Sequence, residues 1–459
     1  MRADDVAALT GGRLDGVDAA TIVRGPVVID SREAAAGSMF VALPGEHVDG
    51  ARFIGDAIRR GAVLALTSNP VGEPAVVVDD VEKALGFLAG GLLRRTPAVN
   101  VCGVTGSSGK TSTKDLIASV LRADGATVAA RGSFNNEIGL PLTVLQVEAA
   151  TRHLVLEYSA RGVGHISYLA GIAPPKMAVV LNVGQAHLGE FGSREAIARA
   201  KGELVEALPT TGVAILNLDD PLVAGMAGRT SARVVTYGEA GGADVRIEGV
   251  TEDDEAHARF RLVTPAGSAE VALAVHGRHQ AGNAAAAAAV GLEVGMPLAA
   301  VVAALEGATA QSPHRMAVGH RADGLLVVDD AYNANPESVR AALEALVRLS
   351  APRAGRSWAV LGEMRELGAS SDTLHHAIGQ AVAELGVDHL VVVGESVGEI
   401  CAGAKSVSGW AGSCMAVETV EEAVTAVGTA AAPEDVVLVK ASNALQLWRV
   451  AESLVGEPA

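Results

Sequence analysis

Apolar residues in this chain gather into short continuous runs that are separated by segments with helical spacing. Such runs occupy residues 98–102, 154–156, 177–181 and 213–216, and again residues 325–330, 357–361, 390–393 and 436–439. Continuous apolar runs of this length are typical of parallel strands that are buried on both faces by helices. The pattern therefore predicts an α/β fold built around mostly parallel sheets.

Two other stretches follow different patterns. Residues 243–275 alternate apolar and polar positions, which is typical of an antiparallel sheet with one exposed face. Residues 281–305 are mostly small and apolar but are interrupted by Asn283 and Glu293, so they predict a pair of buried helices and not a membrane span. We therefore expect a protein that is not embedded in a membrane.

The length of the chain predicts about three domains. The first part reads as a small α/β unit, with strands expected at residues 21–29, 37–43 and 62–67 and helices at 53–60 and 81–95. Thr96-Pro97 and Ser312-Pro313 interrupt the helical and strand patterns. The expected domains are therefore residues 1–97, 98–312 and 313–459.

The sequence GVTGSSGKT, residues 103–111, lies between a predicted strand and a predicted helix. Glycines at such a place let backbone N–H groups surround phosphate oxygens, and the helix N-terminus adds partial positive charge. Lys110 would reach the β- and γ-phosphates, and the Thr111 hydroxyl would bind Mg²⁺. The glycine spacing departs from the usual P-loop, so we expect a variant nucleotide site; the alternative is a glycine turn with a solvated lysine.

The composition narrows the possible functions. The chain has 459 residues, of which 49% are hydrophobic, and a formal net charge of −17 at pH 7. This acidic balance argues against a nucleic-acid partner, which requires a basic face. Cys102, Cys401 and Cys414 have no metal-ligand spacing and the first residues lack an apolar secretion segment, so we expect reduced thiols in a cytoplasmic protein. No pattern requires more than a monomer.

Glu157 and His187 each follow a predicted strand, so both are expected at the carboxyl edge of the central sheet. A carboxylate suits Mg²⁺ well and an imidazole suits it less. The alternatives are a carboxylate at a helix start for Glu157 and a hydrogen-bonded loop histidine for His187.

Lys201 lies on the apolar face of a predicted helix, between Ile197 and Leu204. A lysine turned inward loses hydration, which lowers its pKa. The neutral amine can then combine with CO₂ to give a carbamate, an anion that binds metal. Spacing alone favours the alternative, a lysine whose ammonium extends to solvent.

Three further places could complete a nucleotide site. Asn283 begins the alanine-rich segment, where an N-cap is the alternative. Residues 329–336, DDAYNANP, lead into a helix, and Asn335 with Pro336 suits its first turn, but capping leaves the other polar residues unexplained. Arg315 lies at the predicted hinge, where it could contact a phosphate; the alternative is a surface arginine.

These segments resemble the Mur ligase family over nearly the whole chain. The likeness rests on DSREAAAGSMFVALPGEHVDGARFI in the first region, on TGSSGKTSTK, SFNNEIGLPLTVL, LNVGQAHLGEFGS, AKGELVEAL and LNLDDP in the second, and on DDAYNANPES and LGEMRELG in the third. The NNEIGLP and DAYNANP segments are the most specific, and they resemble the family members that add D-alanyl-D-alanine.

The resemblance implies a UDP-substrate-binding N-terminal domain, a central P-loop ATPase domain and a C-terminal Rossmann-like domain. ATP would be held by Thr105, Gly106, Ser107, Ser108, Gly109, Lys110 and Thr111, by Asn283 and Asn335 near the adenine, by Asp330 near the ribose and by Arg315 near the γ-phosphate. The Mg²⁺ ligands would be Thr111, Glu157, His187 and a carbamylated Lys201. Lys110, Lys201, His187 and Arg315 would serve catalysis. Ser31 and Arg32 would lie near the uridine, and Asn136 and Asn333 in the cleft.

The implied activity is ATP-dependent addition of D-alanyl-D-alanine to UDP-N-acetylmuramoyl-tripeptide through an acyl phosphate. The alternatives are a paralogous ligase with another amine acceptor or another UDP-muramoyl peptide, and a P-loop switch that forms no bond. Two segments depart from the family pattern. Glu-Tyr-Ser-Ala at residues 157–160 stands in place of Glu-Met-Gly-Ala, where Tyr158 and Ser159 could crowd the metal site. Lys-Ala-Ser-Asn at residues 440–443 lacks the usual final arginine, so Asn443 removes a cation.

Overall fold

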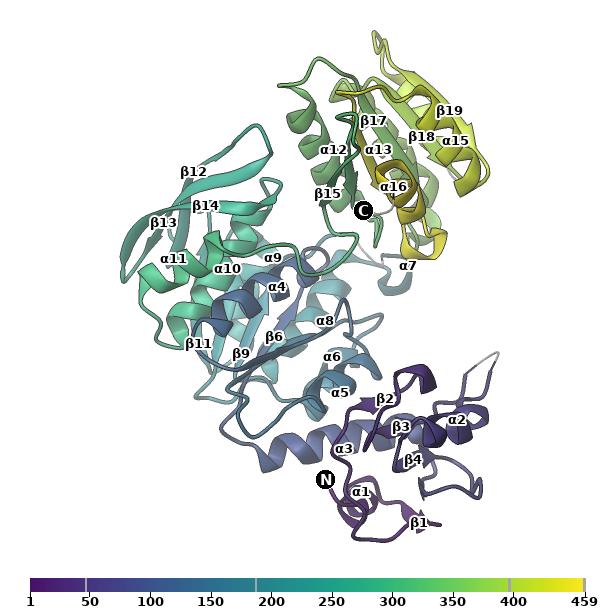
Figure 1. The fold of residues 1–459 in the computed structure, drawn as a ribbon. Helices are drawn as coiled ribbons and strands as arrows, with labels where there is room; N and C mark the ends of the chain where they lie inside the picture. Colours follow the sequence, from purple (N-terminus) through teal and green to yellow (C-terminus); the bar gives the residue numbers. More distant parts are fainter. Residues whose placement is uncertain (46–47, 186–187, 395–397, 457–459) are drawn as a thin grey trace.

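Three sheets, arranged one after another along the molecule, make up the computed structural model (Figure 1). It describes residues 1–45, 48–185, 188–394 and 398–456. The N-terminal region lies at one end, the C-terminal region at the other, and the central region joins them. Within the described ranges, no helix combines the length and the apolar composition that crossing a bilayer requires.

The N-terminal region contains a five-stranded sheet of order β1-β5-β4-β3-β2, which is parallel except for β1. Its main elements are α1 (Ala3–Thr10), β1 (Arg13–Asp15), β2 (Val27–Val28), β3 (Met39–Val41), α2 (Ile54–Arg59), β4 (Leu64–Thr67), β5 (Ala75–Val77) and α3 (Val81–Arg95). The helix expected at 81–95 is confirmed. The strand expected at 21–29 is wrong over most of its length, because Pro26 has no N–H for pairing and β2 begins only after it.

The central region contains a nine-stranded sheet of order β14-β13-β12-β11-β10-β9-β6-β8-β7. Its elements are β6 (Asn100–Thr105), α4 (Lys110–Arg122), β7 (Thr127–Ala129), α5 (Gly139–Val144), β8 (His153–Glu157), α6 (His165–Ile172), β9 (Met177–Val180), α7 (Leu188–Phe191), α8 (Arg194–Glu206), β10 (Val213–Asn217), α9 (Pro221–Ala224), β11 (Arg233–Gly238), β12 (Val245–Glu252), β13 (His257–Thr264), β14 (Gly267–His276), α10 (Gln280–Glu293) and α11 (Leu298–Glu306).

Both sequence patterns of this region are confirmed. The strands from β7 to β12 in the sheet order pair in parallel, whereas β12, β13 and β14 pair antiparallel. The predicted helix pair is α10 and α11. Side chains of α4, α10 and α11 form one hydrophobic core, and those of α5, α6 and α8 form another. These two cores cover the sheet and leave its carboxyl edge open for ligand residues.

The C-terminal region contains a six-stranded sheet of order β15-β16-β20-β17-β18-β19, parallel except for β15. Its elements are β15 (Ala317–His320), β16 (Leu326–Asp329), α12 (Pro336–Ser350), β17 (Ser357–Gly362), α13 (Ser371–Glu384), β18 (His389–Val393), α14 (Gly398–Ser406), β19 (Ser413–Val417), α15 (Val420–Ala430), β20 (Val436–Lys440) and α16 (Trp448–Val455). The four expected strands are present. The sequence did not predict β15 or β19. Both are edge strands whose side chains are exposed or half-buried; β15 carries no apolar run, and the short apolar run at residues 414–417 of β19 was missed.

The expectation of three reduced thiols is wrong for two of them. Cys401 in α14 and Cys414 in β19 form a disulfide, whereas Cys102 is free and buried. Because α14 leads directly into β19 and packs beside it, the two Cα atoms lie 5.8 Å apart, within bridging range. The spacing of the cysteines in the sequence did not show that their elements are neighbours.

Candidate active site

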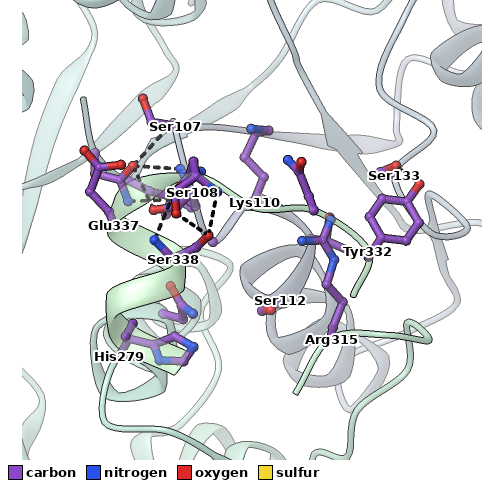
Figure 2. A pocket seen from close by; sticks show the side chains of 18 of the residues that line it. Ser107, Ser108, Lys110, Ser112, Ser133, His279, Arg315, Tyr332, Glu337 and Ser338 are labelled. Atoms are coloured by element: carbon purple, nitrogen blue, oxygen red, sulfur yellow. Dashed lines mark hydrogen bonds between the residues drawn. The ribbon is translucent and has the colours of Figure 1, made fainter. Parts of the chain in front are cut away.

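A cavity of about 610 Å³ lies between the carboxyl edge of the central sheet and the C-terminal region (Figure 2). The predicted site residues that line it come from both regions. They are Ser107, Ser108, Gly109, Lys110, Thr111, Glu157 and Asn283 from the central region and Arg315, Asp330, Asn333 and Asn335 from the C-terminal region. The fold therefore brings together most of the residues predicted to hold a nucleotide.

The glycine loop joins β6 to α4, so the predicted strand, loop and helix are confirmed. Gly109 has a φ of 78°, which favours glycine, and a β-carbon there would lie only 3.1 Å from Asn283 Oδ1. Lys110 Nζ donates to the carbonyl oxygen of Gly106 at 2.8 Å. Burial lowers the pKa of Lys110, although Glu157 acts in the opposite direction. Lys110 is half-buried and its ammonium is bonded to the loop, so the alternative of a freely solvated lysine on a glycine turn is wrong.

Glu157 is the last residue of β8 and is fully buried. Its Oε2 accepts a hydrogen bond from Asn135 Nδ2 at 3.2 Å, but its Oε1 has no partner. Buried carboxylate oxygens are normally paired, so an unpaired one on a residue that lines the cavity fits a cation. The helix-start alternative is wrong, because α6 begins only at His165.

A divalent ion is compatible with this part of the cavity. The described residues contain no cluster of three or more histidine, cysteine or acidic side chains that could hold a metal. Mg²⁺ does not need such a cluster, because it takes one or two protein oxygens together with phosphate oxygens and water. The free Glu157 oxygen and the Thr111 hydroxyl at the start of α4 fit that mode. His187 lies outside the described residues.

Lys201 lies on the buried face of α8 with Ile197 and Leu204, so its predicted orientation is confirmed. None of the described side chains or carbonyl groups accepts a hydrogen bond from it. Burial, reinforced by the charge of Lys110, holds the pKa of the Lys201 amine well below its usual value. The alternative of an ammonium that extends to solvent is wrong. Lys201 does not line the cavity, but it lies close enough to Lys110 for that charge to act on it.

Arg315 reaches across from the C-terminal region into the cavity. One of its terminal nitrogens donates to Thr111 Oγ1 at 3.3 Å, and its guanidinium carbon lies 4.4 Å from the centre of the Tyr332 ring. The Tyr332 hydroxyl bonds in turn to Ser133, as Figure 2 shows. The buried Nε–H of Arg315 has no partner among the described residues and the residue lines the cavity, so the surface alternative is wrong.

Residues that precede α12, together with Lys440 at the end of β20, form another part of the cavity wall. The buried Lys440 ammonium pairs with Asp330 and donates to the carbonyl oxygen of Asn333 at 3.0 Å. Burial lowers the pKa of Lys440, an effect that Asp330 opposes. Asn335 caps α12 by accepting from Ser338 N–H at 2.9 Å, so its predicted capping role is confirmed. The N-cap alternative for Asn283 is wrong, because this residue lies inside α10 and faces Gly109.

Six of the predicted residues that the structure describes do not line this cavity: Lys201 and the five that follow. Ser31 Oγ donates to Asp56 at 3.1 Å, and the exposed Arg32 pairs with Asp30; both lie in the N-terminal region. Asn136 accepts from Gly139 N–H at 2.9 Å at the start of α5. Thr105 ends β6 and Gly106 begins the glycine loop; the Thr105 hydroxyl donates to the Tyr158 carbonyl oxygen at 2.8 Å.

Sequence reasoning missed several residues of the cavity wall, among them Asn182, Asn217, Asp219, Tyr237, His279 and Glu337. Asn182 accepts from the N–H groups of Ser107 and Ser108 at 3.0 and 2.9 Å, so it fixes the glycine loop. Asn182 follows β9 and Asp219 follows β10, so the strand-end argument that found Glu157 could have found them. No comparable local signal marks Glu337.

The two departures from the family pattern differ in their surroundings. Tyr158 points away from the cavity into the core, where its hydroxyl bonds to Ala173. A β-carbon at Gly103 would lie 2.7 Å from the Tyr158 ring, so that glycine provides the space. The expectation that Tyr158 could crowd the metal site is therefore wrong. Ser159 and Asn443 do line the cavity.

Known proteins resemble the chain throughout its length. Family models match residues 26–90 (Mur ligase family, catalytic domain), 104–291 (Mur ligase middle domain) and 314–443 (Mur ligase, glutamate ligase domain). The UDP-N-acetylmuramoyl-tripeptide–D-alanyl-D-alanine ligase of Mycobacterium leprae is 45% identical and covers 95% of this chain and 94% of its own length. The Escherichia coli enzyme of the same name is 36% identical over 84% of each chain.

Solved structures give the same result. A crystal structure of MurF from Acinetobacter baumannii superposes with a TM-score of 0.87 at 32% identity, covering 99% of this chain and 98% of its own. MurF from Thermotoga maritima in complex with ADP superposes with a TM-score of 0.80 at 30% identity, covering 94% and 97%. The chain belongs to the Mur ligase family.

Proposed function

We propose that this protein is an ATP-dependent ligase that joins D-alanyl-D-alanine to UDP-N-acetylmuramoyl-tripeptide and releases ADP and phosphate. The observation that carries the proposal is the cavity lined by the glycine loop, Glu157 and Arg315, in which a buried oxygen of Glu157 and the buried Nε–H of Arg315 have no partner in the described part of the chain. Relatives that bear this activity in their names match 95% of the chain at 45% identity. The product would be the pentapeptide precursor of peptidoglycan.

The reaction needs charge neutralisation and positioning more than covalent help from the protein. The terminal carboxylate of the tripeptide attacks the γ-phosphorus and displaces ADP, which gives an acyl phosphate. The amine of D-alanyl-D-alanine then attacks the acyl carbon and loses a proton, and the tetrahedral intermediate expels phosphate. Lys110 and Arg315 offset the negative charge that the phosphoryl group carries during transfer. The stacking of Arg315 on Tyr332 orients its guanidinium toward Thr111.

Glu157 and Thr111 are the described residues that would hold Mg²⁺, with His187 as a further candidate ligand. When bound, the ion neutralises phosphate charge and orients the phosphate oxygens. Lys201 would carry the carbamate, which forms when its neutral amine attacks CO₂ and releases a proton. The burial of Lys201 and its lowered pKa support this modification, because only the neutral amine is nucleophilic.

We assign the binding of the UDP end of the substrate to residues 1–97, with Ser31 and Arg32 near the uridine. Residues 98–312 would bind ATP, and residues 313–459 would form the opposite wall of the cavity. Asn136 would act in the cleft, since it follows Ser133 and Asn135, which line the cavity. We also propose that the enzyme works as a monomer in the cytoplasm.

A second candidate is a paralogous ligase with another amine acceptor. Asn443 favours it, because this residue lines the cavity at a position where the family pattern carries a cation. A P-loop switch is less well supported, because a switch does not need a buried amine such as Lys201 behind the loop.

ADP release by the purified protein with Mg²⁺-ATP and UDP-N-acetylmuramoyl-tripeptide, with and without D-alanyl-D-alanine, tests the proposal. We expect sustained release only with both substrates, together with a product of pentapeptide mass. Lys201→Ala should lower turnover by about 10²-fold, as loss of an oriented charged group does. Release with another amine in place of D-alanyl-D-alanine would establish the paralogue, and release that needs neither peptide would contradict the ligase.

A further inference from the structure

Arg315 is flanked by two residues with unusual backbone conformation. His314 has a φ of 57° and Met316 a φ of 52°, so both adopt the left-handed conformation although neither is glycine. Non-glycine residues rarely do so, and such strain persists only where the surroundings fix it. The backbone around Arg315 is therefore held in place by its neighbours.

The 330–332 loop holds this backbone on both sides of Arg315. The carbonyl oxygen of His314 accepts from Tyr332 N–H at 3.2 Å. The N–H of Met316 donates to Asp330 Oδ1, also at 3.2 Å. These two bonds fix the path of the main chain, but neither accounts for the left-handed conformation of His314 itself.

The side chain of His314 supplies the remaining anchor. Its Nδ1 lies 2.6 Å from Asp329 Oδ2, at the end of β16. Its ring stacks on Trp448, the first residue of α16, with ring centres 5.2 Å apart and planes inclined by 25°. Neither Asp329 nor Trp448 lines the cavity. The ring is thus held by two residues that lie outside the cavity.

We propose that His314 is a positioning residue: held between Asp329 and Trp448, it maintains the left-handed turn that directs the Arg315 guanidinium to Thr111 and Tyr332. The inference deepens the proposed function, since it takes Arg315 as the cation that faces the transferred phosphate. An arginine that is displaced by about 1 Å loses much of its effect on the transition state. His314 would therefore govern kcat without contacting a substrate.

The test compares full-length variants by their kcat, KM for ATP and melting temperature. His314→Ala should lower kcat by about 10²-fold with less than about 3-fold change in the KM for ATP, since it misplaces a group that acts in the transition state. His314→Asn should recover kcat to within about 5-fold, because asparagine tolerates the left-handed conformation and its amide can donate to Asp329.

His389→Ala is the matched control. His389 also stacks on a tryptophan, Trp358, with ring centres 4.0 Å apart, and its Nδ1 lies 2.7 Å from Ser413 Oγ, but it does not line the cavity. This variant should lose thermal stability as His314→Ala does and keep kcat within about 2-fold, because substitutions far from a site act independently of it.

The double variant His314→Ala/Arg315→Ala separates positioning from general damage. If His314 acts through Arg315, then adding His314→Ala to Arg315→Ala lowers kcat by less than about 3-fold beyond the loss caused by Arg315→Ala alone. An equal loss of kcat in both backgrounds, or wild-type kcat in His314→Ala, would overturn the inference. Wild-type kcat in Arg315→Ala would instead contradict the role that the proposed function gives to Arg315.

Discussion

The central region is joined to its two neighbours in different ways. On the N-terminal side, α3 contributes Leu85 and Leu88 to the N-terminal core and Ala89 and Leu93 to the central core. On the C-terminal side, Ala256 joins the C-terminal core, and polar side chains of the two regions contact each other across the cavity. Arg315 donates to the Thr111 hydroxyl, and the Tyr332 hydroxyl bonds to that of Ser133. Glu337 accepts from Gln185 N–H at 2.9 Å.

The contrast indicates which of the two connections can move. We call the connection through α3 the apolar joint and the connection between the central and C-terminal regions the polar joint. Separating the apolar joint would expose the buried faces of α3 and cost about 25 cal/mol for each Å² of apolar surface. Polar contacts exchange with water at a net cost of only about 1 kcal/mol each. The polar joint is therefore the one that can open to admit substrates, and the cavity is complete only when it is closed.

Removing the charge that crosses the polar joint should have the largest effect. Arg315→Ala leaves the phosphoryl charge unopposed from the C-terminal side, so kcat should fall by about 10³-fold, as with other arginines that reach into phosphoryl-transfer sites. Steady-state ADP release measures the change.

Arg348→Ala provides the control for this substitution. Arg348 crosses the same joint outside the cavity, where it donates to the carbonyl oxygen of Glu252 at 2.7 Å. The kcat of Arg348→Ala should stay within about 5-fold of wild type, since the loss of a single polar contact is worth about 1 kcal/mol. Equal losses in the two variants would mean that the joint as a whole matters, and not the cation.

Overpacking the apolar joint should change stability and leave catalysis intact. A β-carbon at Gly86 in α3 would lie 3.0 Å from Ile172 Cδ1, so Gly86→Leu should lower the free energy of unfolding by about 1–3 kcal/mol. Gly171→Leu is the control, because Gly171 has no heavy atom within 4 Å of its β-carbon position. Thermal denaturation compares the two variants. A large fall in kcat for folded Gly86→Leu would show that this joint also moves during catalysis.

The sequence predicts the elements that depend on residues close together in the chain. It does not predict the contacts between residues that are far apart in the chain. The glycine loop, α3, the parallel strands and the inward face of α8 follow from local pattern. Lys440 pairs with Asp330 and Glu337 reaches Gln185 across long stretches of chain, so no local pattern marks these contacts. The same limit explains the two cysteines, whose pairing depends on the packing of α14 beside β19.

The smallest effect is expected for a single hydrogen bond across the polar joint. Tyr332→Phe removes the hydroxyl that bonds to Ser133 and keeps the ring beneath Arg315. The loss of one such bond is worth about 1 kcal/mol, so kcat/KM for ATP should fall by about 5-fold. Tyr332→Leu removes the ring as well, so its kcat/KM for ATP should fall further. Equal values for both variants would show that the ring does not support Arg315.

A crystal structure of the protein with Mg²⁺ and a non-hydrolysable ATP analogue tests the central claim most directly, that one nucleotide site is assembled across the polar joint. We expect the triphosphate on the glycine loop, with Lys110 Nζ released from Gly106 and the Arg315 guanidinium within hydrogen-bond distance of the terminal phosphate. A nucleotide bound by the central region alone, with the joint closed and Arg315 directed away from the phosphate, would contradict the account.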